Sequence, residues 1–184
     1  MSEVRVGIIG IGNMGSAHLD CIYKQKVEGM RVTAVCDTAP EQVLYVQENY
    51  PGVAVYDTVA AFFADAPVDA VIVATPHKFH AQLGIAALEH NFHLLVEKPE
   101  DVSVSKAHAL NVAAKRSGKV FGIMFNQRTN PLFAKARELV KSGQLGGLRR
   151  SVWIITNWYR TQSYYNSGGW RATWDGEGGG VLLN

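Results

Sequence analysis

A glycine-rich turn with the sequence GIGNMG, residues 10–15, directly follows an apolar segment, residues 4–9. Asp37 ends the next apolar segment, 22 residues after Gly15. A strand, a G-x-G-x-x-G turn, a helix and a later acidic residue form the pattern of a dinucleotide-binding βαβ unit, whereas the glycines alone would be a weak signal. Gly10 would allow the tight turn, Gly12 would let the backbone approach a pyrophosphate, and Gly15 would let the helix pack on the sheet.

The same turn predicts where a cofactor would bind. Unpaired N–H groups at the start of a helix attract phosphate, and the helix dipole favours negative charge there. The Asp37 carboxylate would accept hydrogen bonds from ribose hydroxyls and repel a 2′-phosphate, and no Arg or Lys lies within three residues after it. We therefore expect NAD(H) in preference to NADP(H). The alternative is an ordinary glycine-rich turn, with Asp37 capping the helix that starts at Pro40. The expected contacts in the turn are Gly10, Ile11, Gly12, Asn13 and Met14.

Strand and helix patterns alternate along the first two-thirds of the chain. Such alternation predicts an α/β fold, a Rossmann-type doubly wound parallel sheet with helices on both faces. Segment 69–74 is a continuous apolar run, as expected for a buried parallel strand. The expected strands are 4–9, 32–37, 53–56, 69–74, 92–96 and 120–123, and the expected helices are 14–26, 40–49, 58–64, 77–90 and 103–117.

The composition changes after about residue 124. Segment 131–142 predicts a helix, followed by a turn at Gly143, Gly146 and Gly147, and segment 148–160 predicts one long strand. An aromatic strand of that length needs a larger sheet to bury its faces. We therefore divide the chain into a Rossmann domain, residues 1–123, and the beginning of a truncated α+β second domain, residues 124–184.

Composition excludes several classes of protein. With 47% hydrophobic and 18% charged residues the chain can form a packed core, and a net charge of +2 is too small to indicate nucleic acid or an anionic membrane. No apolar run approaches the length of a membrane span, and no signal sequence is apparent at the N-terminus. Cys21 and Cys36 are too few for a disulfide framework and suggest a reducing compartment. The default expectation is the cytoplasm.

Polar residues follow the later predicted strands, at the edge where α/β sheets bind ligands. Thr75, Pro76 and His77 leave one strand, and Glu97, Lys98 and Pro99 leave the next. A lysine alone would be an ordinary solvated side chain, but this motif at a strand end favours catalysis. His77 with His80, and His90 with His93, have the spacing of metal ligands, yet no Cys joins them and we expect no metal. Arginines interleaved with aromatics after residue 148 favour a sheet face or a subunit interface over a nucleic-acid platform.

With these motifs and Gly169-Trp170-Arg171, nearly the whole sequence resembles the Gfo/Idh/MocA family of oxidoreductases. The resemblance implies that Lys98 is the catalytic residue, beside the reacting hydroxyl and the nicotinamide. Glu97 would hold the region of the nicotinamide ribose, and Pro99 would fix the turn, through a cis peptide. The other residues implied to line the cofactor are Thr75, Pro76, His77, His80, Trp170 and Arg171.

The resemblance further implies a small-molecule sugar, inositol or related polyol substrate and a homo-oligomer of the full-length protein. Arg128, Asn157 and Asn184 are the weaker candidates for substrate contacts. Family members carry an Asp followed four residues later by a His, and here Asn184 takes the Asp position and the chain stops. We therefore expect the 184 residues to bind cofactor but to be catalytically incomplete. The alternatives are a non-catalytic NAD-binding sensor and a reductase of a non-polyol substrate. His18, in the first helix, is expected to face solvent or to pack, without a functional role.

Overall fold

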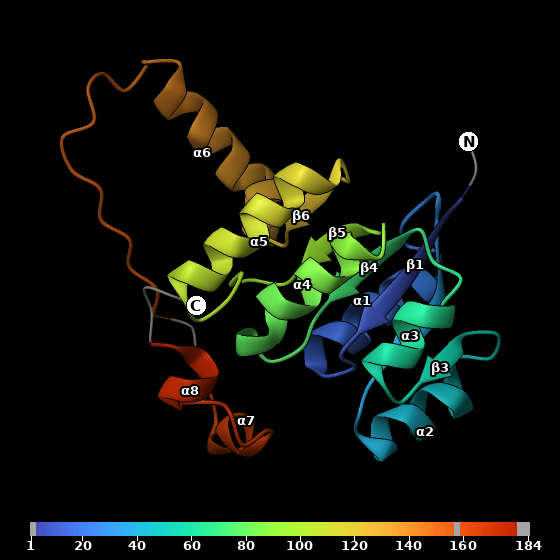
Figure 1. Cartoon of the computed structure of the whole chain (residues 1–184). Helices are drawn as coiled ribbons and strands as arrows, with labels where there is room; N and C mark the ends of the chain where they lie inside the picture. The colour runs from blue at the N-terminus through green and yellow to red at the C-terminus, as the bar shows by residue number, and fades with distance from the viewer. Residues whose placement is uncertain (1–2, 157–158, 180–184) are drawn as a thin grey trace. The chain divides into compact units, whose positions relative to one another are not determined.

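The computed structural model describes residues 3–156 and 159–179. A six-stranded sheet, entirely parallel, has the strand order β3-β2-β1-β4-β5-β6 (Figure 1). This is the order of a dinucleotide-binding Rossmann sheet, so the predicted doubly wound α/β fold is confirmed. The strands are β1 (Val4–Ile9), β2 (Met30–Cys36), β3 (Ala54–Tyr56), β4 (Ala70–Val73), β5 (His93–Val96) and β6 (Phe121–Ile123).

Helices connect the strands, and local sequence explains where they begin and end. Pro40 occupies the first turn of α2, where its missing N–H costs nothing. The Thr58 hydroxyl accepts the Ala61 N–H and caps α3. Gly118, with φ of 67°, ends α5. The connecting helices are α1 (Asn13–Tyr23), α2 (Pro40–Asn49), α3 (Val59–Asp65), the 3-10 turn η1 (His77–Phe79), α4 (His80–Glu89) and α5 (Val104–Ser117).

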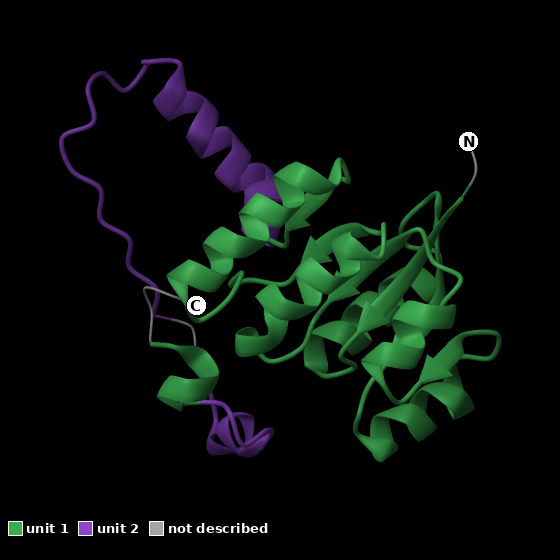
Figure 2. Ribbon diagram, in the orientation of Figure 1, with its two compact units in different colours: residues 1–124, 172–184 green, residues 125–171 purple. Residues whose placement is uncertain are grey.

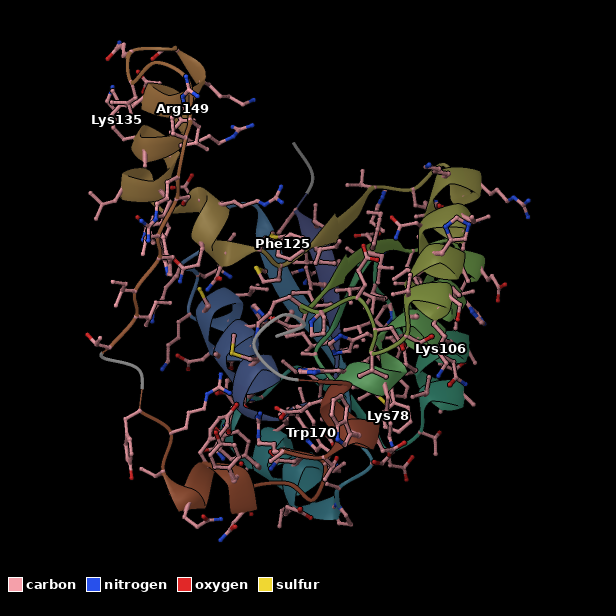
Figure 3. The ribbon with its side chains drawn as sticks, turned by 90° about the vertical axis from the view of Figure 1, so that its left-hand side faces the viewer. Lys78, Lys106, Phe125, Lys135, Arg149 and Trp170 are labelled. Carbon is pink, nitrogen blue, oxygen red and sulfur yellow. The ribbon has the colours of Figure 1, made fainter. Side chains whose placement is uncertain are left out.

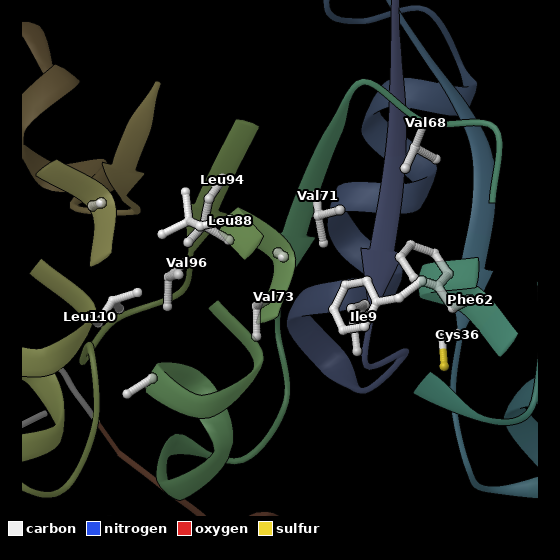
Figure 4. Packing of buried hydrophobic residues seen from close by; sticks show 14 of the residues in the cluster. Ile9, Cys36, Phe62, Val68, Val71, Val73, Leu88, Leu94, Val96 and Leu110 are labelled. Atoms are coloured by element: carbon white, nitrogen blue, oxygen red, sulfur yellow. The ribbon is translucent and has the colours of Figure 1, made fainter. Parts of the chain in front are cut away.

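Two hydrophobic clusters cover the two faces of the sheet. Successive residues of β4 alternate between them: Val71 and Val73 belong to the cluster with α3, α4 and α5, and Ile72 belongs to the cluster with α1 and α2. Figure 4 shows the first cluster, which includes the fully buried Phe62. Apolar side chains project from both faces of the sheet. The sheet is therefore buried between two layers of helices, as is usual for parallel sheets.

The strand register determines where the connecting loops begin. Ile9 pairs with Cys36 on one side and with Val73 on the other, and Val73 pairs with Val96. The carboxyl ends of β2, β1, β4 and β5 therefore lie in one row. The residues that directly follow these strands therefore lie along a single edge of the sheet. They are Gly10, Asp37, Ala74 and Glu97.

The chain divides into two compact units, coloured in Figure 2. Unit 1 comprises residues 1–124 and 172–184, and unit 2 comprises residues 125–171. Unit 1 thus also takes in a segment that the sequence analysis placed in the second domain, including α8 (Trp174–Glu177). Unit 2 holds η2 (Asn126–Thr129), α6 (Pro131–Lys141) and α7 (Gln162–Asn166).

The long strand expected at residues 148–160 is wrong for the residues that the structure describes. Residues 148–156 and 159–160 form no strand or helix there, and residues 151–156 are exposed. A strand requires backbone partners to accept and donate its ladder hydrogen bonds, and a high content of aromatic and β-branched residues does not replace them. The expected helix before it is confirmed as α6, where the Asn130 side chain accepts the Leu132 N–H at 2.9 Å.

Candidate functional site

Two glycines shape the turn after β1 by close backbone contacts. Gly10 has φ of +91°, and a Cβ there would lie 2.9 Å from the Ala74 carbonyl oxygen. At Gly15 a Cβ would lie 1.8 Å from the Gly10 carbonyl oxygen. Only glycine fits either position, because contacts that short do not occur between real side chains and backbone. The turn can therefore hold α1 tightly against the end of the sheet.

The outer side of the same turn is open. Gly12, Asn13 and Met14 are exposed, and a Cβ on Gly12 would meet nothing within 4 Å. Gly12 is the N-cap of α1, and among the described residues no side chain caps this helix and no acidic residue lies in its first turn. The first N–H groups of α1 are thus available to an anion, and the positive end of the helix dipole favours one. These features fit a cofactor diphosphate.

Asp37 connects the end of β2 to the glycine turn. Its Oδ2 accepts the Ile11 N–H at 2.6 Å, and its Oδ1 accepts the Ala39 N–H at 2.9 Å. A carboxylate has about four acceptor positions, so the two bonds leave others for a ligand hydroxyl. The Ile11 side chain, 1% exposed, belongs to the core, so this residue offers its backbone and not its side chain.

His80 joins the loops after β4 and β5. Its Nε2 lies 2.7 Å from the Thr75 carbonyl oxygen, and its Nδ1 lies 2.6 Å from the Pro99 carbonyl oxygen. The ring is 1% exposed, and the His77 ring, whose residue is 7% exposed, lies 5.7 Å from it. His80 is therefore buried against the backbones of the two loops that it connects. The Lys98–Pro99 peptide bond is cis, as the resemblance implied.

His18, for which no functional role was predicted from the sequence, contacts the Glu97-Lys98-Pro99 motif. His18 Nε2 lies 2.7 Å from Glu97 Oε1, and the two side chains are 16% and 7% exposed. Glu97 Oε2 also accepts the Lys98 N–H at 3.2 Å, and Lys98 itself is half-buried. His18 thus links α1, which begins at the glycine turn, to the motif. The signal for it was its spacing: three residues after Gly15, it lies on the same face of α1 as the glycine that packs on the sheet.

The last described residues of unit 1 lie against η1. Lys78 forms an ion pair with Asp175 of α8 (Lys78 is labelled in Figure 3). The Thr173 hydroxyl accepts the Gly176 N–H at 3.0 Å and caps α8, and Glu177 Oε2 accepts the Ala172 N–H at 2.9 Å. Segment 172–179 is thereby held beside the loop that begins with Thr75 and Pro76.

The remaining predicted contacts belong to unit 2 or lie outside the described residues. The Arg171 guanidinium stacks on Tyr164 and Trp170, with its carbon 4.3 and 4.5 Å from the ring centroids, and it donates to the Tyr164 hydroxyl. Arg128 is exposed, with its guanidinium 5.0 Å from the Phe125 ring centroid. Asn157 and Asn184 lie outside the described residues. The contacts of Trp170, Arg171, Arg128, Asn157 and Asn184 with cofactor or substrate stay predictions.

The histidine pairs do not form a metal centre in the described part of the chain. There, no three His, Cys, Asp or Glu side chains come together as metal ligands. His90 Nδ1 contacts the Ala86 carbonyl oxygen and His93 Nδ1 accepts the Val120 N–H. No described helix is both long and apolar enough to cross a membrane.

A family model described as an oxidoreductase family with an NAD-binding Rossmann fold, Gfo/Idh/MocA, matches residues 4–125. An inositol 2-dehydrogenase of Corynebacterium glutamicum is 31% identical over 147 residues, which cover 79% of this chain and 43% of that protein. A 1-carboxy-3-chloro-3,4-dihydroxycyclohexa-1,5-diene dehydrogenase of Comamonas testosteroni is 28% identical over 146 residues, 79% of this chain and 36% of that protein.

Solved structures show the same fold. The WlbA dehydrogenase of Bordetella pertussis, in complex with NADH and UDP-GlcNAcA, has a TM-score of 0.85 at 23% identity, over 99% of this chain and 54% of that one. The scyllo-inositol dehydrogenase of Lactobacillus casei, with bound NAD(H) and scyllo-inositol, has a TM-score of 0.74 at 23% identity, over 79% of this chain and 43% of that one. The chain therefore spans about half or less of the length of these relatives.

Proposed function

The chain belongs to the Gfo/Idh/MocA oxidoreductase family with its NAD-binding Rossmann fold, and from that premise we propose that it serves hydride transfer between NAD and a hydroxyl-bearing carbon of a sugar, inositol or related polyol. The observation that carries the proposal is the strand register. It brings the open glycine turn, Asp37, Thr75 and the Glu97-Lys98-Pro99 motif to one edge of the sheet. Ligands of α/β sheets bind at this edge.

NAD, when bound, supplies the hydride acceptor or donor, and the chain's own residues would do the rest. The N–H groups of the turn would hold the diphosphate, and Asp37 would hold the adenosine ribose. Lys98 would hydrogen-bond the substrate oxygen and exchange its proton as charge develops there. Glu97 would fix the loop that carries Lys98. The residues proposed around the nicotinamide are Thr75, Pro76, His77, His80, Trp170 and Arg171.

A polyol substrate is supported by the relatives. They include inositol dehydrogenases and a D-glucoside 3-dehydrogenase of Escherichia coli, 30% identical over 145 residues. Substrate contacts are proposed for Arg128, Asn157 and Asn184.

We place the protein in the cytoplasm and expect the full-length protein to be a homo-oligomer. Since the matched relatives are about twice as long or longer, we propose that these 184 residues bind NAD without turning over a polyol alone.

The test of cofactor binding is a fluorescence titration of the chain with NADH and, separately, NADPH. We expect saturable NADH binding at least about tenfold tighter than NADPH binding, because the Asp37 carboxylate repels a 2′-phosphate. Asp37→Ser should reduce the difference in affinity between NADH and NADPH. Equal affinity for both cofactors in the unsubstituted chain would overturn the preference for NAD, and binding of neither would overturn the cofactor site.

The test of chemistry uses the natural protein that contains these residues. We expect it to reduce NAD in the presence of a polyol, and Lys98→Met to abolish turnover while NADH still binds. Turnover retained in Lys98→Met would remove Lys98 from the mechanism. Turnover confined to C=C or C=N substrates would assign the site to a reductase of another class.

A further inference from the structure

The His80 ring lies between two carbonyl oxygens that belong to different loops of the proposed site. It is the first residue of α4, is 1% exposed, and places Nε2 2.7 Å from the Thr75 oxygen and Nδ1 2.6 Å from the Pro99 oxygen. One oxygen follows β4 and the other follows β5. The ring therefore spans the gap between the two loops.

The count of donors decides the protonation state of this ring. A carbonyl oxygen only accepts, and a neutral imidazole has one N–H and one bare nitrogen. In a neutral His80 the bare nitrogen would face the lone pairs of a carbonyl at less than 3 Å, which is repulsive. An imidazolium donates from both nitrogens. Both distances are also shorter than the usual N–H···O distance of about 2.9 Å, as in charge-assisted bonds. We infer that His80 is a doubly protonated imidazolium that clamps the two loops and is a positioning residue for Lys98.

A buried cation needs compensation, since burial and the N-terminal end of a helix both disfavour positive charge. The loop that His80 grips supplies two buried carboxylates. Glu97 and Asp101 are 6% and 4% exposed, and each lies two residues from Pro99 along the chain. The same loop carries Lys98 and Glu100, η1 carries His77 and Lys78, and α8, which packs against η1, carries Asp175 and Glu177. Glu97 and Asp101 are the buried carboxylates on the loop that His80 contacts, and we assign to them the negative charge that balances the ring.

The clamp acts on the residue that the proposed function depends on. Pro99 follows Lys98 directly, so a bond that fixes the Pro99 carbonyl restricts the backbone that carries the lysine. The Thr75 carbonyl gives the other anchor, on the loop beside which the cofactor would lie. The inference rests on the proposed function only in naming Lys98 as the group that meets substrate. The protonation of His80 can be measured without any cofactor.

The first experiment is long-range ¹H–¹⁵N NMR of the histidine rings in the whole chain, from about pH 5 to 8. The His80 signals are assigned by their absence in His80→Gln, or by through-bond correlation if that variant does not fold. We expect both His80 nitrogens to carry protons throughout this range. One bare nitrogen in His80 at pH 7 would overturn the inference.

The second experiment tests positioning with His80→Gln, whose single amide nitrogen can reach only one of the two carbonyls. We expect the backbone amide of Lys98 to shift or broaden, and the amides of α5 to stay unchanged. His108→Gln is the matched control and should leave the Lys98 amide unchanged. A Lys98 amide identical in His80→Gln and the original chain would overturn positioning, whereas loss of NADH binding in the original chain would count against the proposed function alone.

Discussion

Individual residues in the glycine turn are required for different reasons, and the difference can be measured. At Gly15 a Cβ would overlap the Gly10 carbonyl oxygen, whereas a Cβ on Gly12 would point into open space. Gly15→Ala should therefore displace α1 and destabilise the fold, by more than about 2 kcal/mol. Gly12→Ala should leave the melting temperature nearly unchanged and weaken NADH binding, since its methyl group would occupy the space where a diphosphate approaches.

Thermal unfolding and NADH titration of both variants test this pair. If Gly12→Ala binds NADH as tightly as the original chain, the diphosphate does not approach at Gly12. If Gly15→Ala is as stable as Gly12→Ala, the close contact between α1 and the turn is not a determinant of the fold.

The His18–Glu97 contact predicts a dependence of stability on a hydrogen-bond donor. Both side chains are largely buried, so His18→Leu would leave the Glu97 carboxylate without this donor. Losing one partner of a buried polar pair costs about 1–3 kcal/mol, whereas removing both costs less. We expect His18→Leu to lower the free energy of unfolding by this amount, His18→Gln to lower it less, and His18→Leu with Glu97→Leu to show coupling. Urea unfolding provides the measurement, and additive effects of the two single substitutions would contradict the prediction.

The two cysteines should differ in reactivity. Burial, with the nearby Asp37 and Asp57 charges, raises the pKa of the Cys36 thiol to about 12, and Cys36 is 1% exposed. Cys21 is half-buried. Because the thiolate is the nucleophile, we expect iodoacetamide at pH 8 to modify Cys21 and spare Cys36 in the folded chain. Mass spectrometry of the digested protein would show this, and denaturant should make both react. Equal labelling of the two in the native state would contradict the burial of Cys36.

At the residue level, site residues with a fixed spacing along the chain could be predicted from the sequence. Contacts that form only when distant segments pack together could not. The glycines and Asp37 were found because a βαβ unit fixes their separation along the chain. The contacts of His18 with Glu97 and of His80 with the Pro99 carbonyl join residues 79 and 19 positions apart. No local pattern reports such a pair, because it exists only once the sheet brings the loops together.

Whole elements were predictable where their own burial defined them. The strands of the sheet are apolar runs bounded by turns, and the structure contains each one within a few residues of its expected bounds. The segment 148–160 has the composition of a strand but lacks one in the described residues. Strand formation depends on partner strands more than on composition, so this element could not be inferred from its own residues.

Strand β1 contacts Asp69, the residue directly before β4, in a way that should make stability depend on pH. Arg5 donates to Asp69 from Nη2, Nε and its backbone N, at 2.6, 3.0 and 2.9 Å. The Arg5 side-chain bonds, then its backbone bond, lower the pKa of the Asp69 carboxyl from 3.8 to about 2. A pKa lower in the folded than in the unfolded state adds stability above the unfolded value, and that stability is lost as pH falls through the folded value.

Asp69→Asn should therefore be less stable than the original chain at pH 7. Since both side chains are about 40% exposed and screened by solvent, we expect a difference of at most about 1 kcal/mol. The difference should shrink as the pH falls below about 4 and vanish below about 2. Urea unfolding at several pH values checks this. A difference that stays constant across the range would show that the ion pair does not supply it.

At the scale of the whole molecule, the hydrophobic core of the described residues belongs to one part of the chain. The buried hydrophobic side chains of the described residues all lie between Val6 and Ala114, within unit 1. Unit 2 contains a run of exposed apolar side chains instead. We call this run, residues 152–155, the exposed apolar segment; its side chains, between 59% and 78% exposed, are Val152, Trp153, Ile154 and Ile155.

Because soluble monomers seldom expose contiguous large apolar side chains, we expect the exposed apolar segment to drive self-association. The sedimentation coefficient of the chain should rise with protein concentration, and Ile154→Lys should reduce that rise without changing NADH affinity, since the glycine turn and Asp37 belong to unit 1. Val104→Lys, at an 89% exposed position on α5, is the matched control and should associate like the original chain. If Ile154→Lys associates as strongly as Val104→Lys, the surface that pairs the chains lies elsewhere. If the original chain sediments as a monomer at every concentration, the exposed apolar segment by itself is not sufficient for the homo-oligomer that we propose.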